Sequence, residues 1–89
     1  MATHASAIKR HKQNERRRAR NHAVRSRVRT AIKQVNEAIA ARALAEAAAR
    51  LRTAERLLSK AVTKGVLQHK TASRHLSRLS RRVNALRAA

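Results

Sequence analysis

Apolar residues between positions 24 and 39 recur at intervals of four and three residues. An α-helix has 3.6 residues per turn, so this spacing gathers the side chains into one stripe along one helical face. The stripe predicts a first helix, which we expect to begin near Ser6, because serine is a common N-cap residue. The stripe consists of Val24, Val28, Ala31, Val35 and Ile39.

The stripe ends after Ile39, and its interruption predicts a turn. Continued by the same steps, it would place charged residues in the core. The apolar positions resume instead on a face rotated by roughly 140° around the helix axis. We therefore predict a turn near residues 40–43, although no typical turn residue marks it, followed by a second helix. The apolar set of this second helix is Leu44, Ala48, Leu51, Leu58 and Val62.

Gly65, the single glycine, marks the end of the second helix. Lys64 places a cation in the last turn, and glycine readily takes the positive φ of a helix terminus. A third helix follows, with Thr71 as its expected N-cap. Proline is absent, and the good helix formers Ala, Leu, Arg and Lys dominate, so the fold class is all-α. The third helix has a narrow seam typical of packed helices, formed by Ala72, Leu76, Leu79, Val83 and Leu86.

The expected architecture is a single domain, residues 1–89, of three antiparallel helices with short connections. At 1.5 Å per residue the first helix is roughly 50 Å long, whereas the others are about 30 Å or less. Residues 1–22 must therefore project as a basic extension beyond a bundle formed by residues 23–89. Because alanine dominates the apolar supply, we expect a thin core of marginal stability without a partner.

The charge balance indicates a polyanionic partner. The chain has 23 Lys and Arg against four Glu, a net charge of +19, and no Phe, Tyr or Trp. A chain so basic repels itself when free and is typical of nucleic-acid or anionic-surface binding. Modules that read single-stranded bases usually stack them on aromatic rings. We therefore expect contacts with the phosphates and the shape of folded or duplex nucleic acid.

The first candidate surface covers residues 9–20, whose seven cations point all around the helix. Like charges four residues apart destabilise a helix, as for Lys12 with Arg16 and Arg16 with Arg20. The free segment is therefore predicted to fray and to become helical when phosphates line it. Its cations are Lys9, Arg10, Lys12, Arg16, Arg17, Arg18 and Arg20.

The second candidate surface is a line of Arg74, Arg78 and Arg81 on the third helix, roughly opposite its apolar seam. Small polar side chains beside it allow a nucleic-acid backbone to approach and can bond phosphate or ribose oxygens. Two basic surfaces on different helices predict a protein wedged between nucleic-acid elements. The neighbouring polar stripe is Ser73, Ser77, Ser80 and Asn84.

Other chemistry finds little support. The five histidines include no pair three or four residues apart, and no carboxylate completes a metal-ligand set. The glutamates are scattered and no Gly-rich phosphate loop exists, so we expect no enzyme, cofactor or small-molecule substrate. Without cysteines, a secretory signal or a membrane-length apolar run, we expect a soluble, cytoplasmic protein.

Matching residues cover essentially the whole chain. They are Ser6-Ala7, Lys9-Arg10, Gln13, Glu15, Arg17, Asn21, Arg25-Ser26, Arg29-Thr30 and Lys33, then Lys60-Ala61, Lys64-Gly65, Ala72, Arg74, Ser77-Arg78-Leu79 and Asn84. As an ensemble they resemble the bacterial small-subunit ribosomal protein S20 family. The resemblance implies a three-helix, non-enzymatic protein that acts early in subunit assembly. It implies direct binding to 16S rRNA, in the 5′ domain and near the base of the long 3′ minor-domain helix, and through the rRNA an association with other small-subunit components.

The resemblance also implies which residues face the rRNA. These are Ser6, Lys9, Arg10, Gln13, Arg17, Asn21, Arg25, Ser26 and Arg29 on the first surface, and Lys64, Arg74, Ser77 and Arg78 on the second. The candidate set is completed by Lys12, Arg16, Arg18, Arg20, Lys33, Lys70 and Arg81. The chain departs from the family pattern in two places. The family commonly has His where this chain has Gln68, and Asn where it has Lys70. The turn at Ala41-Arg42-Ala43 often contains Gly and Asp in the family.

On the residues alone, two other classes stay open. A histone-like nucleoid DNA-binding protein has similar charge, but most such proteins dimerise through larger apolar interfaces or insert apolar wedges. A basic amphipathic membrane-surface helix usually has a bulky apolar face, which the most basic segment lacks. Enrichment of chromosomal DNA over rRNA would favour the first, and sedimentation with anionic vesicles would favour the second.

Overall fold

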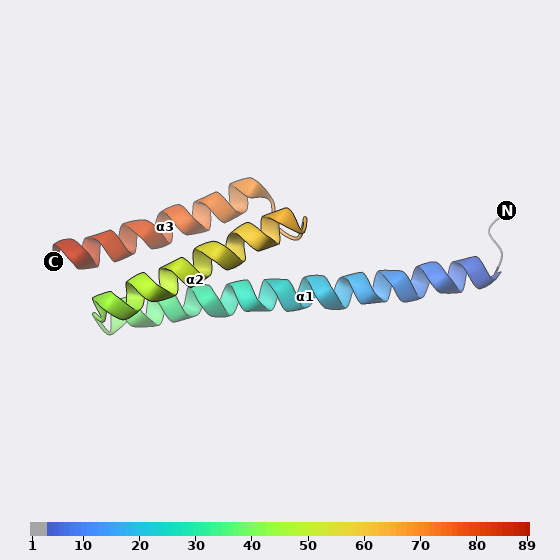
Figure 1. Cartoon of the computed structure of the whole chain (residues 1–89), viewed down its shortest axis with the longest axis horizontal. Coiled ribbons are helices and arrows are strands. Elements are labelled where there is room, and N and C mark those ends of the chain that lie inside the picture. The colour runs from blue at the N-terminus through green and yellow to red at the C-terminus, as the bar shows by residue number, and fades with distance from the viewer. Residues whose placement is uncertain (1–3) are drawn as a thin grey trace.

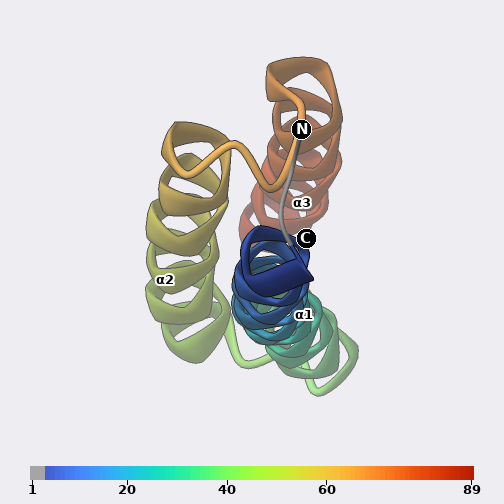
Figure 2. The ribbon, with the colours of Figure 1, turned by 90° about the vertical axis from the view of Figure 1, so that its right-hand side faces the viewer.

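The computed structural model describes residues 4–89 and contains three α-helices. Helix α1 spans His4–Ala40, α2 spans Leu44–Thr63 and α3 spans His69–Ala88. Each helix runs antiparallel to the one before it, so α3 runs in the same direction as α1 (Figure 1). Seen along the long axis, the helices occupy the corners of a triangle (Figure 2). The predicted all-α, three-helix fold is confirmed. Residues 1–3 of the predicted extension lie outside the described residues.

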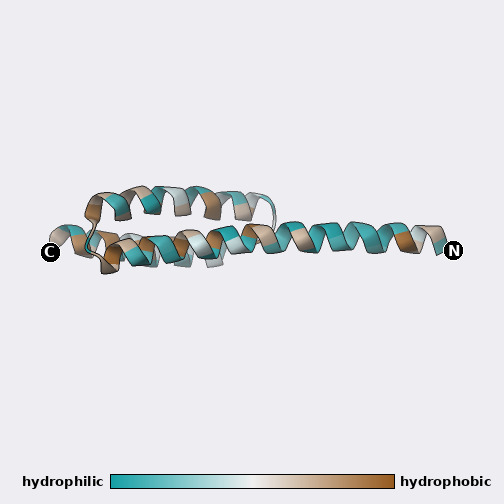
Figure 3. Cartoon of the chain, turned by 90° about the horizontal axis from the view of Figure 1, so that it is seen from below, coloured by the Kyte–Doolittle hydropathy of each residue, from teal (hydrophilic) through white to brown (hydrophobic). Residues whose placement is uncertain are grey.

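The N-terminal half of α1 projects beyond the other two helices, as predicted (Figure 1). The molecule measures 65 × 21 × 14 Å along its principal axes. Between His4 and Ala23 no residue is buried, and the first buried residue is Val24. In Figure 3 most of this projecting part has hydrophilic colours, apart from a hydrophobic patch near its N-terminal end, whereas hydrophobic colours recur along the three helices of the bundle. We call residues 4–22 the basic arm.

The core consists of two apolar clusters along the bundle. No polar or charged residue within the described residues is buried. The cluster nearer the α1–α2 turn contains Ala31, Val35, Ala38, Ala47, Ala54, Leu79 and Val83. The cluster nearer the arm contains Val24, Val28, Leu58, Ala61, Val66 and Ala72. The predicted stripe of the first helix and the seam of the third both contribute to these clusters, with Ile39, Leu76 and Leu86 partly buried at their margins.

The predicted core face of α2 is wrong in detail. Of the expected set only Leu58 is buried, and the others are half-buried at the margin. Small side chains let two helix axes approach closely, so alanines occupy the centre of the interface and larger leucines flank it. The α1–α2 interface is accordingly the most extensive in the bundle. The residues of α2 that are buried are Ala47, Ala54, Leu58 and Ala61.

Helix α2 ends in a Schellman motif at Gly65, as the sequence predicted. Gly65 has φ 73°. Its N–H donates to the Val62 carbonyl oxygen at 3.0 Å, and the Val66 N–H donates to the Ala61 carbonyl oxygen at 2.9 Å. Both bonds satisfy carbonyls that the helix end would leave unpaired. Val66 is buried, so the motif also anchors the following loop in the core.

Helix α1 ends in the same motif without a glycine. Arg42 has φ 55°. The Arg42 N–H donates to the Ile39 carbonyl oxygen and the Ala43 N–H to the Ala38 carbonyl oxygen, both at 3.0 Å. These are again the two Schellman bonds. The turn predicted from the change of apolar phase is therefore confirmed, and an arginine takes its left-handed position.

Both predicted N-caps are wrong. Helix α1 is already formed at His4, so Ser6 lies inside it. Helix α3 begins at His69 after Gln68, whose extended backbone (φ −74°, ψ 144°) precedes the helix, and Thr71 lies within the first turn. The physical reason at α3 is tertiary: burial of Val66 fixes where the chain re-enters the bundle, and this outweighs the capping preference of threonine.

Candidate nucleic-acid interface

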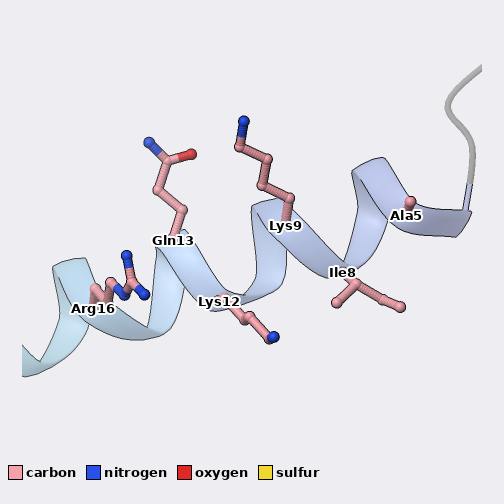
Figure 4. Close-up of a pocket in the computed structure, with 6 residues that line it drawn as sticks. All are labelled: Ala5, Ile8, Lys9, Lys12, Gln13 and Arg16. Atoms are coloured by element: carbon pink, nitrogen blue, oxygen red, sulfur yellow. The ribbon is translucent and has the colours of Figure 1, made fainter.

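The basic arm is a cationic rod. All seven predicted cations between positions 9 and 20 are exposed. The side chains of Lys9 and Gln13 project from one side of α1, and those of Ile8 and Lys12 project from the other (Figure 4). The hollow between them is open surface along a single helix. Glu15 reaches Arg18 at 3.9 Å, but both side chains are exposed, so this pair contributes little.

One face of the arm continues the core face of the bundle. Steps of three and four residues back from Val24 reach Asn21, Arg17 and Gln13, and then Arg10 and Ser6. Helices α2 and α3 cover this face from Val24 onward, and Figure 1 shows that they end before the arm. A partner in contact with this face of the arm would therefore cover the same side of α1 that α2 and α3 cover in the bundle. These five positions all belong to the predicted rRNA-binding set.

The α1–α3 side brings together parts of both predicted surfaces. Arg25 and Arg29 of α1 line a groove with His75 of α3. Arg78 is exposed one helical turn after His75, on the same flank of α3. The two surfaces therefore approach each other across this groove. His75 is not in the predicted set, because the sequence shows no histidine pair or motif that would single it out.

The α1–α2 side carries a cluster of cations that the sequence analysis missed. Arg27 of α1, Lys60 of α2 and Lys64 line one shallow hollow with Val24 and Leu57. Lys64 was predicted on the same surface as Arg74 and Arg78, and the structure groups it instead with α1 and α2. These cations meet because of the way α1 and α2 are aligned along each other. The sequence pattern does not predict that alignment.

The remaining predicted residues are dispersed. Ser26 is half-buried and lines a shallow α1–α2 hollow with Thr30 and Gln34. Lys33 lies 3.9 Å from Glu37, four residues further along α1. On α3, the residues Lys70, Arg74, Ser77 and Arg81 are exposed, as a solvent-facing surface requires.

Two arginines outside the predicted set make contacts within the bundle. Arg50 Nη1 on α2 donates to Gln34 Oε1 on α1 at 3.3 Å, and its Nε lies 3.9 Å from Glu46 Oε1. Arg82 Nη1 on α3 donates to Asn36 Oδ1 on α1 at 2.9 Å. These guanidinium groups link the outer helices to α1, so part of the positive charge serves the fold.

Two kinds of site were searched for in the part of the chain that the structure describes: a cluster of metal-ligating side chains and a membrane-spanning helix. Within residues 4–89, no three His, Cys, Asp or Glu side chains gather where they could hold a metal ion. None of the three helices is long and apolar enough to cross a membrane.

Comparisons with known proteins agree with the resemblance seen in the residues. The family model described as ribosomal protein S20 matches residues 2–84. Three similar proteins are each named small ribosomal subunit protein bS20. That of Solidesulfovibrio magneticus is 51% identical over 89 residues, with 100% of both chains covered. That of Syntrophus aciditrophicus is 53% identical over 85 residues (96% of each), and that of Desulfovibrio desulfuricans is 50% identical over 88 (99% of each). The prediction of a non-enzymatic protein is thereby confirmed, and the chain belongs to the ribosomal protein S20 family.

Proposed function

We propose that this chain is a structural component of the small ribosomal subunit that binds 16S rRNA directly. In this proposal residues 1–22 and 23–89 form one rRNA-binding unit, an arm and a bundle. The basic arm carries the proposal, because it is a helix with seven exposed cations between positions 9 and 20 and no apolar face. Such a helix has nothing to pack against in its own chain and is stabilised by phosphates around it.

The mechanism is electrostatic neutralisation. Arm cations replace condensed counterions on the rRNA backbone, and the released ions drive binding. The core-side face of the arm, with Arg10 and Arg17, meets one rRNA element. The cations of the α1–α3 and α1–α2 sides meet others, so the bundle holds converging rRNA helices at fixed positions.

The proposed rRNA targets come from the family resemblance. They are the 5′ domain of 16S rRNA and the base of the long helix of its 3′ minor domain. The 65 Å length of the molecule supports contact with two separate elements, since the arm and the far end of the bundle are remote from each other. The names of the relatives support the subunit assignment.

Ultraviolet crosslinking of the tagged chain in bacterial cells, followed by sequencing of the attached nucleic acid, tests this proposal. We expect a compact set of 16S rRNA sites. As a control, Arg52 and Arg56 are both replaced with glutamine, because they are exposed on α2 outside the proposed interface. This control should keep the same sites. Reads spread over many RNAs, or dominated by chromosomal DNA, would contradict the proposal, and the second outcome would favour a nucleoid protein.

A further inference from the structure

His75 is held differently from the other histidines. It is half-buried, whereas His4, His11, His22 and His69 are exposed. It lies on α3 and lines the groove against α1. His75 therefore places a flat ring in the wall of the α1–α3 groove, in a chain without Phe, Tyr or Trp.

The lining of this groove combines apolar and cationic side chains. Its apolar lining comes from Val28 and Ile32 of α1 and from Leu67 of the α2–α3 loop, while Arg25 and Arg29 also line it. Its volume is about 200 Å³. Typical cofactor pockets are larger, roughly 300–1,000 Å³. The groove therefore suits a small apolar group that carries a negative charge beside it.

A nucleotide of a folded RNA has this combination. RNA-binding proteins receive unstacked bases on aromatic rings, histidine included, or on guanidinium planes, and they bind the adjoining phosphates with arginine. An apolar side chain of a protein partner would fill the floor but leave two guanidinium groups unneutralised at the contact. Charge complementarity thus favours a nucleotide.

We propose that the α1–α3 groove receives one unstacked nucleobase of the bound RNA. The base lies against the His75 ring and the apolar lining, and its phosphate lies beside Arg25 and Arg29. The identity of the RNA rests on the proposed function, so the probe is the transcribed 5′ domain of 16S rRNA. The groove gives the bundle a base contact in addition to the phosphate contacts of the arm.

The test compares His75→Leu, His75→Phe and His69→Leu in the full chain. Leucine keeps an apolar side chain without a ring, and phenylalanine keeps a ring. His69 is an exposed histidine of the same helix that lines a different hollow, between α2 and α3. Stacking of a base on an aromatic side chain is worth about 1–3 kcal/mol, which corresponds to roughly 5- to 150-fold in affinity. We expect a loss in this range for His75→Leu, near-normal binding for His75→Phe and no change for His69→Leu.

Salt dependence separates stacking from charge. His75→Leu should leave the slope of log affinity against log salt unchanged, whereas Arg25→Gln should reduce its magnitude by about 1. Ultraviolet crosslinking of the unchanged protein should attach a nucleotide to the peptide that contains His75. Circular dichroism checks that each variant folds. If His75→Leu does not fold, the crosslink at His75 in the unchanged protein tests the groove proposal instead.

The outcomes separate the two proposals. Binding of the 5′ domain by the unchanged protein, with equal affinity for His75→Leu and no crosslink at His75, would overturn the groove proposal alone. An equal loss in His75→Leu and His75→Phe would also overturn it, because a ring would then be insufficient. Absence of specific binding by the unchanged protein would overturn the proposed function and the groove proposal with it.

Discussion

Arg82 on α3 donates a hydrogen bond from Nη1 to Oδ1 of Asn36 on α1, at a distance of 2.9 Å. The two residues lie 46 positions apart, and the α1–α3 interface is the least extensive of the three. This polar contact therefore supplements sparse apolar packing.

We expect Arg82→Gln to destabilise the bundle by about 1 kcal/mol, because a charge-assisted hydrogen bond at an exposed site is lost. Thermal unfolding followed by far-ultraviolet circular dichroism measures the change. Arg52→Gln removes the same charge from an exposed position on α2 and should have little effect. Equal melting temperatures for the two variants would show that the Arg82 contact contributes nothing.

The alanine positions of α2 should not tolerate larger side chains. Ala47 is fully buried, and its small size permits the close approach of α1 and α2. Ala47→Leu should cost about 1–3 kcal/mol, since extra methylenes would force the helices apart. Ala49→Leu, at an exposed position of the same helix, is the control. Tolerance of Ala47→Leu in the same unfolding measurement would show that the interface is loosely packed.

Much of the fold follows from the sequence because periodicity and phase are local signals. The stripe from Val24 to Ile39, the phase change after it and Gly65 together give three helices and two turns. The core face of α2 does not follow, because alanine and leucine are both apolar and the pattern does not show which lies nearer α1. The start of α3 was misplaced because burial of Val66 outweighs the capping preference of Thr71.

The candidate interface is predictable in its chemistry and less so in its layout. Charge and the absence of an apolar face are sufficient to identify the basic arm. The grouping of Arg27 with Lys60 and Lys64, and of His75 with Arg25, depends on how helices distant in sequence pack side by side. A pattern read along one helix at a time does not contain that information.

The arm should be less protected from exchange in the free protein than in the complex. Lys12 with Arg16, and Arg16 with Arg20, are like-charged pairs four residues apart, and each weakens the helix by a few tenths of a kcal/mol. Hydrogen exchange should show fast exchange over residues 4–22 without RNA and slower exchange with it. Residues 54–61 of α2 lie in the bundle and provide the internal reference. Equal protection of the arm in both samples would contradict this prediction.

Charges on the core-side face of the arm should control the salt dependence of RNA binding. Arg10→Gln with Arg17→Gln removes two proposed phosphate contacts and should reduce the magnitude of the salt slope by about 2. Filter binding to the 5′ domain of 16S rRNA over a range of salt concentrations measures it. Arg52→Gln with Arg56→Gln removes the same charge from the exposed surface of α2 and should leave the slope nearly unchanged. Equal slopes for the two double variants would indicate a nonspecific charge effect.

Finally, Arg42→Gly should stabilise the bundle, because Arg42 takes the left-handed position of a Schellman motif at φ 55°. That conformation costs an ordinary L-residue about 1–2 kcal/mol and glycine almost nothing. Greater freedom of glycine in the unfolded chain offsets part of the gain, so we expect about 0.5–1 kcal/mol from thermal unfolding. Gly65→Ala is the reciprocal change at φ 73° and should be destabilising, even though an added Cβ would meet no atom within 4 Å. No gain in stability from Arg42→Gly would contradict this prediction, whereas a lower RNA affinity of the same variant would place Arg42 in the rRNA interface.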